Sequence, residues 1–132
     1  MMQFPRKLRA LALVAIMLFA TSALPMQATS VRRVRFPRGR TTTVLRGSIV
    51  NDGMNQYLLS ARAGQTMSVH ITSPRKRAKF DVYPRDNRSA LVSSGAEDTT
   101  DWEGSLPESG DYVISVYSVG GNTSYTLEVA IR

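Results

Sequence analysis

Apolar and polar residues alternate along most of the chain beyond residue 32, with almost no helical spacing. In residues 67–72, the apolar Met67, Val69 and Ile71 are separated by polar residues. Because successive side chains of a β-strand point to opposite faces of a sheet, this pattern predicts a half-buried strand. The same pattern predicts further strands at residues 33–36, 42–49, 57–60, 80–83, 90–93, 101–106, 112–119 and 125–131.

Turn-forming residues separate these segments at regular intervals. Asn51, Asp52 and Gly53 form one predicted turn, since an Asp-Gly pair readily adopts the positive φ of tight turns. Glycine follows Ala63 at the next break, and Pro74 ends the strand after it. Short strands at such spacing predict an all-β fold, an antiparallel and jelly-roll-like β-sandwich of about eight to nine strands.

The first 28 residues have the organisation of a secretory signal peptide. Arg6, Lys7 and Arg9 precede an apolar, uncharged run over residues 10–20, which is too short for a membrane span. Small residues allow cleavage after Ala23 or after Ala28. We therefore expect a periplasmic or secreted protein that does not span a membrane once this segment is removed.

Length and charge support one exported domain. The chain has 132 residues, no cysteine and a net charge of +7. Three of its 17 basic residues and none of its 10 acidic residues lie in residues 1–28, which leaves +4 for residues 29–132. That length suits a single β-sandwich domain held together without disulfide bonds.

Side chains that would support catalysis are scarce. His70 is the one histidine, and it falls on the polar face of its predicted strand, so we interpret it as a surface residue. The acidic residues Asp98, Asp101, Glu103, Glu108 and Asp111 alternate as on a solvated strand, which disfavours a glycosidase pair of carboxylates. Asn51, Asp52 and Asn55 lack the acidic spacing of a calcium loop. We therefore predict a protein that is not an enzyme and has no cofactor or metal.

Basic residues gather in two places. The first cluster follows the predicted signal peptide and comprises Arg32, Arg33, Arg35, Arg38 and Arg40. These arginines are candidates for binding an anionic polymer, or they protect an edge strand from pairing with other chains. The second cluster comprises Arg75, Lys76, Arg77 and Lys79, and we interpret it as a loop. Nucleic acid is not an expected partner, because no aromatic residues are interleaved for base stacking.

Two blocks of sequence resemble a known family. Residues 47–69 carry Gly47, Ile49, Tyr57 and the segment Ala63-Gly64-Gln65, and residues 102–112 read WEGSLPESGDY. Residues 125–129 then fit the closing strand of the same family. In this order the blocks resemble the periplasmic inhibitors of g-type lysozyme and, more remotely, the pre-peptidase C-terminal β-sandwich domains.

The resemblance implies a non-catalytic protein that blocks a lysozyme by placing surface loops in its substrate cleft. The inhibitory loop candidates that follow from it are Pro107, Glu108, Ser109 and Gly110, and Asn51, Asp52 and Gly53. Where those inhibitors commonly have a tyrosine in the latter turn, this chain has none. Where they have a longer loop with arginine and asparagine before the last strand, this chain has only residues 118–123, which contain no basic residue. The alternative hypothesis is an envelope-associated binding or adhesion module, whose first arginine cluster contacts anionic cell-wall or lipopolysaccharide polymers.

Overall fold

The computed structural model describes residues 29–87 and 99–132, which form eight strands and one short 3₁₀ turn. The signal peptide, the strand expected at residues 90–93 and Asp98 lie outside the described residues. In the part that is described, no helix is long and apolar enough to cross a membrane. The elements are β1 (Thr29–Arg33), β2 (Thr42–Ile49), β3 (Met54–Ala61), β4 (Thr66–Thr72), η1 (Pro74–Lys76), β5 (Ala78–Pro84), β6 (Asp101–Ser105), β7 (Gly110–Ser118) and β8 (Thr123–Ile131).

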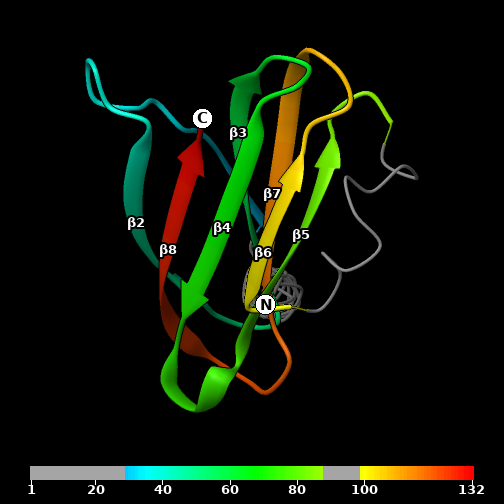
Figure 1. The fold of residues 1–132 in the computed structure, drawn as a ribbon. Coiled ribbons are helices and arrows are strands. Elements are labelled where there is room, and N and C mark those ends of the chain that lie inside the picture. The colour runs from blue at the N-terminus through cyan, green and yellow to red at the C-terminus, as the bar shows by residue number, and fades with distance from the viewer. Residues whose placement is uncertain (1–28, 88–98) are drawn as a thin grey trace, which may run out of the picture.

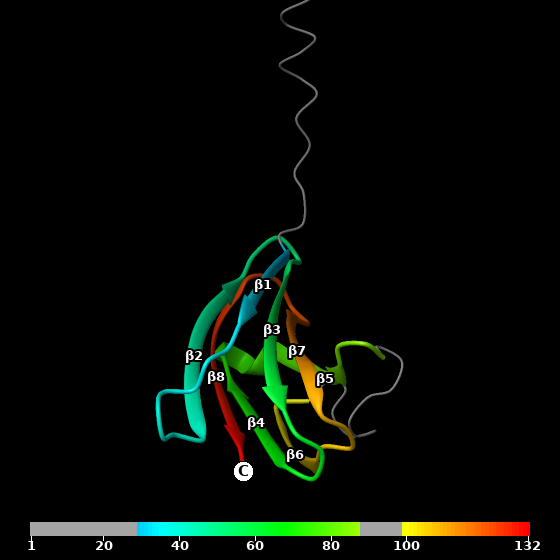
Figure 2. The same cartoon turned by 90° about the horizontal axis from the view of Figure 1, so that it is seen from above.

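The strands form two four-stranded sheets that face each other (Figures 1 and 2). Sheet I has the order β1-β3-β7-β5, and sheet II has the order β2-β8-β4-β6. From β2 to β8, consecutive strands alternate between the two sheets, as in a jelly roll. The predicted β-sandwich is therefore confirmed.

The first strand differs from its prediction in position and direction. The prediction of a strand at residues 33–36 is wrong by several residues, since β1 spans Thr29–Arg33. It pairs with β3 in parallel, whereas the other pairs of strands within the two sheets are antiparallel. Every residue of β1 is exposed, so the strand carries no alternation that could reveal it. The apolar Val34 and Phe36 instead pack on the core just after β1 ends.

The core lies between the sheets and consists of the inward-facing residues of each strand. In β8 the alternation is complete, because Tyr125, Leu127, Val129 and Ile131 are all buried while Ser124 and Glu128 are exposed. Met67, Val69 and Ile71 of β4 lie on the same inner face, as their spacing predicts. Burial of these aliphatic and aromatic side chains is the main source of stability in a domain without disulfides.

Two glycines of the sequence blocks described above, Gly47 and Gly104, leave room for aromatic rings. A Cβ atom on Gly47 would lie 2.5 Å from the hydroxyl oxygen of Tyr125, and a Cβ atom on Gly104 would lie 2.5 Å from Cζ2 of Trp102. The Tyr125 hydroxyl bonds that of Tyr57 across the sandwich, and this bond joins the two sheets. Burial, and then this hydrogen bond, raise the pKa of Tyr57. These glycines therefore belong to the packing of the fold.

Candidate functional site

The structure places the two sets of predicted inhibitory residues at opposite ends of the sandwich. Asn51 and Gly53 lie in the turn between β2 and β3, whereas Ser109 precedes β7. In the antiparallel pair formed by β3 and β7, Ala61 lies opposite Gly110 and Asn55 lies opposite Val116. A strand of this length separates the two ends by roughly 25 Å. One cleft in a partner can therefore receive only one of the two sets.

The turn at residues 107–110 is exposed and is hydrogen-bonded to neighbouring parts of the fold through Ser109 and the backbone of Glu108. The Ser109 hydroxyl accepts a hydrogen bond of 2.9 Å from the backbone N–H of Ala63, in the neighbouring β3–β4 turn. The Tyr112 hydroxyl donates to the carbonyl of Glu108 at 2.6 Å and accepts from the N–H of the same residue. Gly110 has φ +142°, a conformation that favours glycine. This segment of the motif therefore holds neighbouring turns together.

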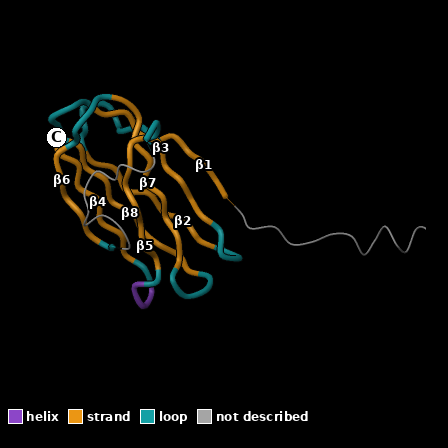
Figure 3. Tube along the Cα trace, turned by 90° about the vertical axis from the view of Figure 1, so that its right-hand side faces the viewer, coloured by secondary structure: helices purple, strands orange, loops and turns teal. Residues whose placement is uncertain are grey.

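Three tight turns meet at the other end. We call this surface, made of residues 50–53, 73–77 and 119–122, the three-turn end; Figure 3 shows it, with η1 in purple, away from the C-terminus. The side-chain oxygen of Asn122 accepts a hydrogen bond of 2.9 Å from the N–H of Asn51, and the N–H of Val119 donates to the carbonyl of Arg77 at 2.9 Å. The β2–β3 and β4–β5 turns are thus each tied to the β7–β8 hairpin.

Two of these turns hold non-glycine residues in the left-handed region. Asn51 and Asp52 have φ of 54° and 56°, and the N–H of Gly53 donates to the carbonyl of Val50, which makes a type I′ turn. The positive φ predicted for an Asp-Gly pair is thus adopted by Asn51 and Asp52. Arg75 and Lys76 have φ of 55° and 54° in the turn closed by Arg77 and Pro74. Long basic side chains are unusual in this conformation.

The three-turn end is apolar and cationic at its surface. Val50 is 44% exposed and Val119 is 57% exposed, in a molecule with few other exposed large apolar residues among those described. Arg75, Lys76 and Arg77 lie in the β4–β5 turn that is bonded to Val119, and they form no ion pair within residues 29–87 and 99–132. The sequence predicts a plain loop for this basic run. Its position directly after Pro74, between two predicted strands, was the available signal of an exposed turn.

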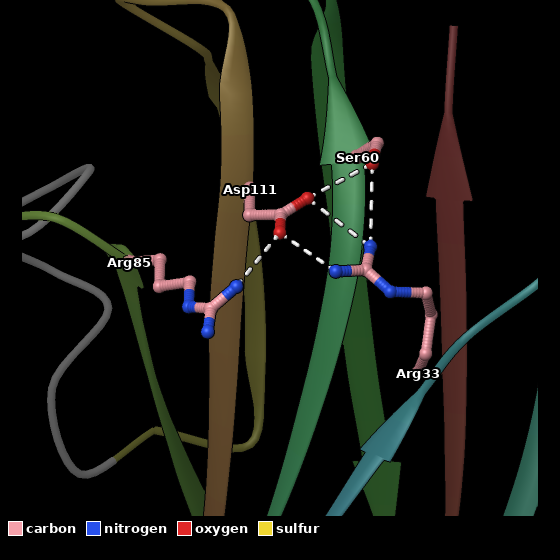
Figure 4. A network of polar contacts seen from close by, with 4 residues as sticks. All are labelled: Arg33, Ser60, Arg85 and Asp111. Carbon is pink, nitrogen blue, oxygen red and sulfur yellow. Dashed lines mark hydrogen bonds and ion pairs between the residues drawn. The ribbon is translucent and has the colours of Figure 1, made fainter.

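The first arginine cluster is not a uniform basic patch. Asp111 of β7 accepts two hydrogen bonds from Arg33 of β1, at 2.7 and 3.1 Å, and one from Ser60 of β3 at 2.9 Å (Figure 4). Arg85, just after β5, donates to the same carboxylate at 3.3 Å. The network therefore crosses all of sheet I and holds the edge strand β1 in place. Arg32, Arg35, Arg38 and Arg40 have no such partner among the described residues.

The same contacts hold the carboxylate of Asp111 in its charged form. The hydrogen bond from Arg33, followed by that from Ser60, lowers the pKa of Asp111 well below its usual range. A group with a depressed pKa stabilises the fold at pH values above its unfolded pKa, near 4 for aspartate. This stabilisation is lost as the pH falls from about 4 toward the pKa of the folded protein.

Asp111→Asn is expected to lower the free energy of unfolding at pH 7 by about 1 kcal/mol, because it removes the negative charge that pairs with both arginines and one of the two acceptor oxygens. The difference from the unaltered protein should shrink as the pH falls below about 4, because Asp111 then takes up a proton on unfolding, which favours the unfolded chain. Urea unfolding at pH 7 and pH 3 measures both effects. Asp86→Asn is the control, because Asp86 is exposed and has no ion pair among the described residues. Equal loss at both pH values would contradict the role of the charge.

The described residues bring together no catalytic or metal constellation. His70 and Asp101 are neighbours on the outer face of sheet II, with Nδ1 and Oδ1 3.5 Å apart, whereas Asp111 lies on sheet I. No group of three or more histidine or acidic residues in residues 29–87 and 99–132 is arranged to hold a metal ion. Asn55, considered above with Asn51 and Asp52, donates its side-chain amide to Tyr125 and to the carbonyl of Ser48.

No family model matches the chain, and no curated protein does so by sequence. Solved structures do match it. The chain is similar to the periplasmic g-type lysozyme inhibitor PliG of Aeromonas hydrophila, with a TM-score of 0.71 and 29% identity over 81% of this chain and 100% of that one. Salmonella Typhimurium PliG matches with a TM-score of 0.59 and 22% identity, over 80% of this chain and all of that one. The pre-peptidase C-terminal domain of a Bacillus anthracis collagenase matches with a TM-score of 0.54 and 12% identity, over 83% of this chain and all of that domain. The fold is thus that of the PliG inhibitors and of a pre-peptidase C-terminal domain, as the two sequence blocks indicated.

Proposed function

We propose that this chain is an exported, non-catalytic inhibitor of a g-type lysozyme. The observation that carries the proposal is the similarity to Aeromonas hydrophila PliG, which extends over the whole of that inhibitor at 29% identity. The basic and apolar N-terminal segment, read as a signal peptide, agrees with the periplasmic location of that protein. Such an inhibitor would protect peptidoglycan in the compartment to which it is exported.

The three-turn end is the surface that we assign to the lysozyme. Its turns form a projecting edge of the sandwich, with exposed Val50 and Val119 among charged residues, a composition typical of a protein interface. The opposite turn, by contrast, already uses Ser109 and the backbone of Glu108 in hydrogen bonds within the fold. Of the inhibitory candidates, we therefore assign Asn51, Asp52 and Gly53 to the contact with the lysozyme.

The test is the rate at which a g-type lysozyme lyses a peptidoglycan suspension in the presence of purified residues 29–132. We expect the rate to fall to near zero at a molar excess of the protein, because an occupied cleft cannot bind glycan. Lysozymes of the c and i types serve as controls for specificity. An unchanged rate of lysis by several g-type enzymes would refute the proposed function.

A further inference from the structure

We propose that the β4–β5 turn is the cationic contact of the inhibitory surface, and that Arg75 and Lys76 pair with carboxylates in the lysozyme's substrate cleft. This inference rests on the proposed function and names the residues that recognise the partner. Three observations support it: the strain of the turn, the absence of partners for its charges, and its place in the fold.

The conformation of the turn is one that its residues do not favour. Two successive residues with φ near 55° make a type I′ turn, for which Asn-Gly is the preferred pair. Arginine and lysine occupy these positions here. A left-handed conformation is costly for such residues and persists where the surrounding structure imposes it, often at binding sites. The turn therefore requires an explanation beyond connecting β4 to β5.

The fold does not use the charges of the turn. Arg75, Lys76 and Arg77 have no ion pair or side-chain hydrogen bond among the described residues. By contrast, Arg33 and Arg85 on sheet I share the carboxylate of Asp111. Three neighbouring cations without a counter-ion repel one another, and a partner that supplies negative charge would relieve this repulsion.

The turn lies against the β7–β8 hairpin, which precedes the last strand as the arginine-bearing loop does in the inhibitors that the sequence resembles. The carbonyl of Arg77 accepts the backbone hydrogen bond from Val119, and a Cβ atom on Gly120 would lie 3.8 Å from Cγ of Arg77. The hairpin, residues 118–123, has no basic residue of its own. Arg46, on the adjoining face of sheet II, lines a shallow hollow together with Pro74 and is also without an ion pair among the described residues. The hairpin itself carries no positive charge, but the β4–β5 turn and Arg46 provide positive charge next to it.

The chemistry of a lysozyme provides the complementary charge. Enzymes that hydrolyse glycosidic bonds place carboxyl groups beside the bond that they cleave, so their clefts contain carboxylates. Guanidinium and ammonium groups that enter such a cleft form charge-assisted hydrogen bonds in a partly dehydrated setting. Because these contacts are electrostatic, they also accelerate association and weaken as salt rises.

The experiment compares two double variants that remove the same charge from opposite ends. The first, Arg75→Asn with Lys76→Gly, gives the β4–β5 turn its preferred residues. The second, Arg38→Asn with Arg40→Gly, alters an exposed turn beside the start of β2. We expect the first to raise the inhibition constant for a g-type lysozyme by about 10-fold or more, with a melting temperature that is unchanged or higher by a few degrees. The second should change the inhibition constant by less than about 2-fold, since its charges lie far from the interface.

Each outcome decides the inference. Equal inhibition constants for the first variant and the unaltered protein would overturn it, while leaving the proposed function intact. Equal losses in both variants would also overturn it, because net charge rather than the turn would then be responsible. A clear fall in the melting temperature of the first variant would show that the fold needs these residues, which contradicts the inference. Failure of the unaltered protein to inhibit would refute the proposed function itself.

Discussion

Gly47→Ala is expected to lower the free energy of unfolding by about 3 kcal/mol. The new methyl group would lie 2.5 Å from the Tyr125 hydroxyl oxygen and 2.7 Å from Cζ of the same ring, well inside contact distance. The ring cannot rotate away cheaply, because it is buried and its hydroxyl bonds both Tyr57 and Asn55. Either the sheets separate locally or these buried hydrogen bonds break, and each costs stability. Urea unfolding measured by circular dichroism gives the magnitude.

Gly120→Ala is the matched control for this variant. A Cβ atom there meets nothing closer than 3.8 Å, and the residue lies in an exposed hairpin. Its free energy of unfolding should change by less than about 0.5 kcal/mol. In a Tyr125→Leu background the additional cost of Gly47→Ala should become much smaller, since the clash is removed. A Gly47→Ala protein as stable as Gly120→Ala would contradict the described packing of Tyr125.

The fold was predictable where each strand has one buried and one exposed face. In β4 and β8 the alternation of residues such as Val69 and Leu127 directly records which face meets the core. In β1 every residue is exposed, so no alternation of buried and exposed residues marks the strand. Its parallel pairing with β3 requires a crossover connection, which no local sequence pattern encodes. The predicted strand at residues 33–36 rests on the apolar Val34 and Phe36, which contact the core but lie outside any strand.

The candidate site was predictable only in part, because its residues are distant in sequence. Turn chemistry located Asn51 and Ser109 in loops, but nothing local indicates that these loops lie at opposite ends of the sandwich. The pairing of Arg33 with Asp111 joins residues 78 positions apart, so Arg33 looked like a free cation in the sequence. Likewise, the contact between Arg77 and Val119 makes one surface from two turns that the chain separates by several strands.

Val119→Trp is expected to raise the inhibition constant for a g-type lysozyme by about 10-fold or more, which corresponds to about 1.4 kcal/mol of binding free energy. Val119 is exposed at the centre of the three-turn end, between the β4–β5 turn and the β2–β3 turn that Asn122 holds. A large ring there would prevent close approach of the turns to the cleft, without disturbing the core. Glu108→Trp places the same ring on an exposed residue at the opposite end and is the control.

The inhibition constants of these two variants, measured beside that of the unaltered protein in the lysis assay, test the central claim most directly. The claim is that the three-turn end enters the substrate cleft. It predicts strong loss of inhibition for Val119→Trp and a change of less than about 2-fold for Glu108→Trp. Loss of inhibition by Glu108→Trp alone would contradict it, since the opposite end of the sandwich would then be the surface that meets the lysozyme.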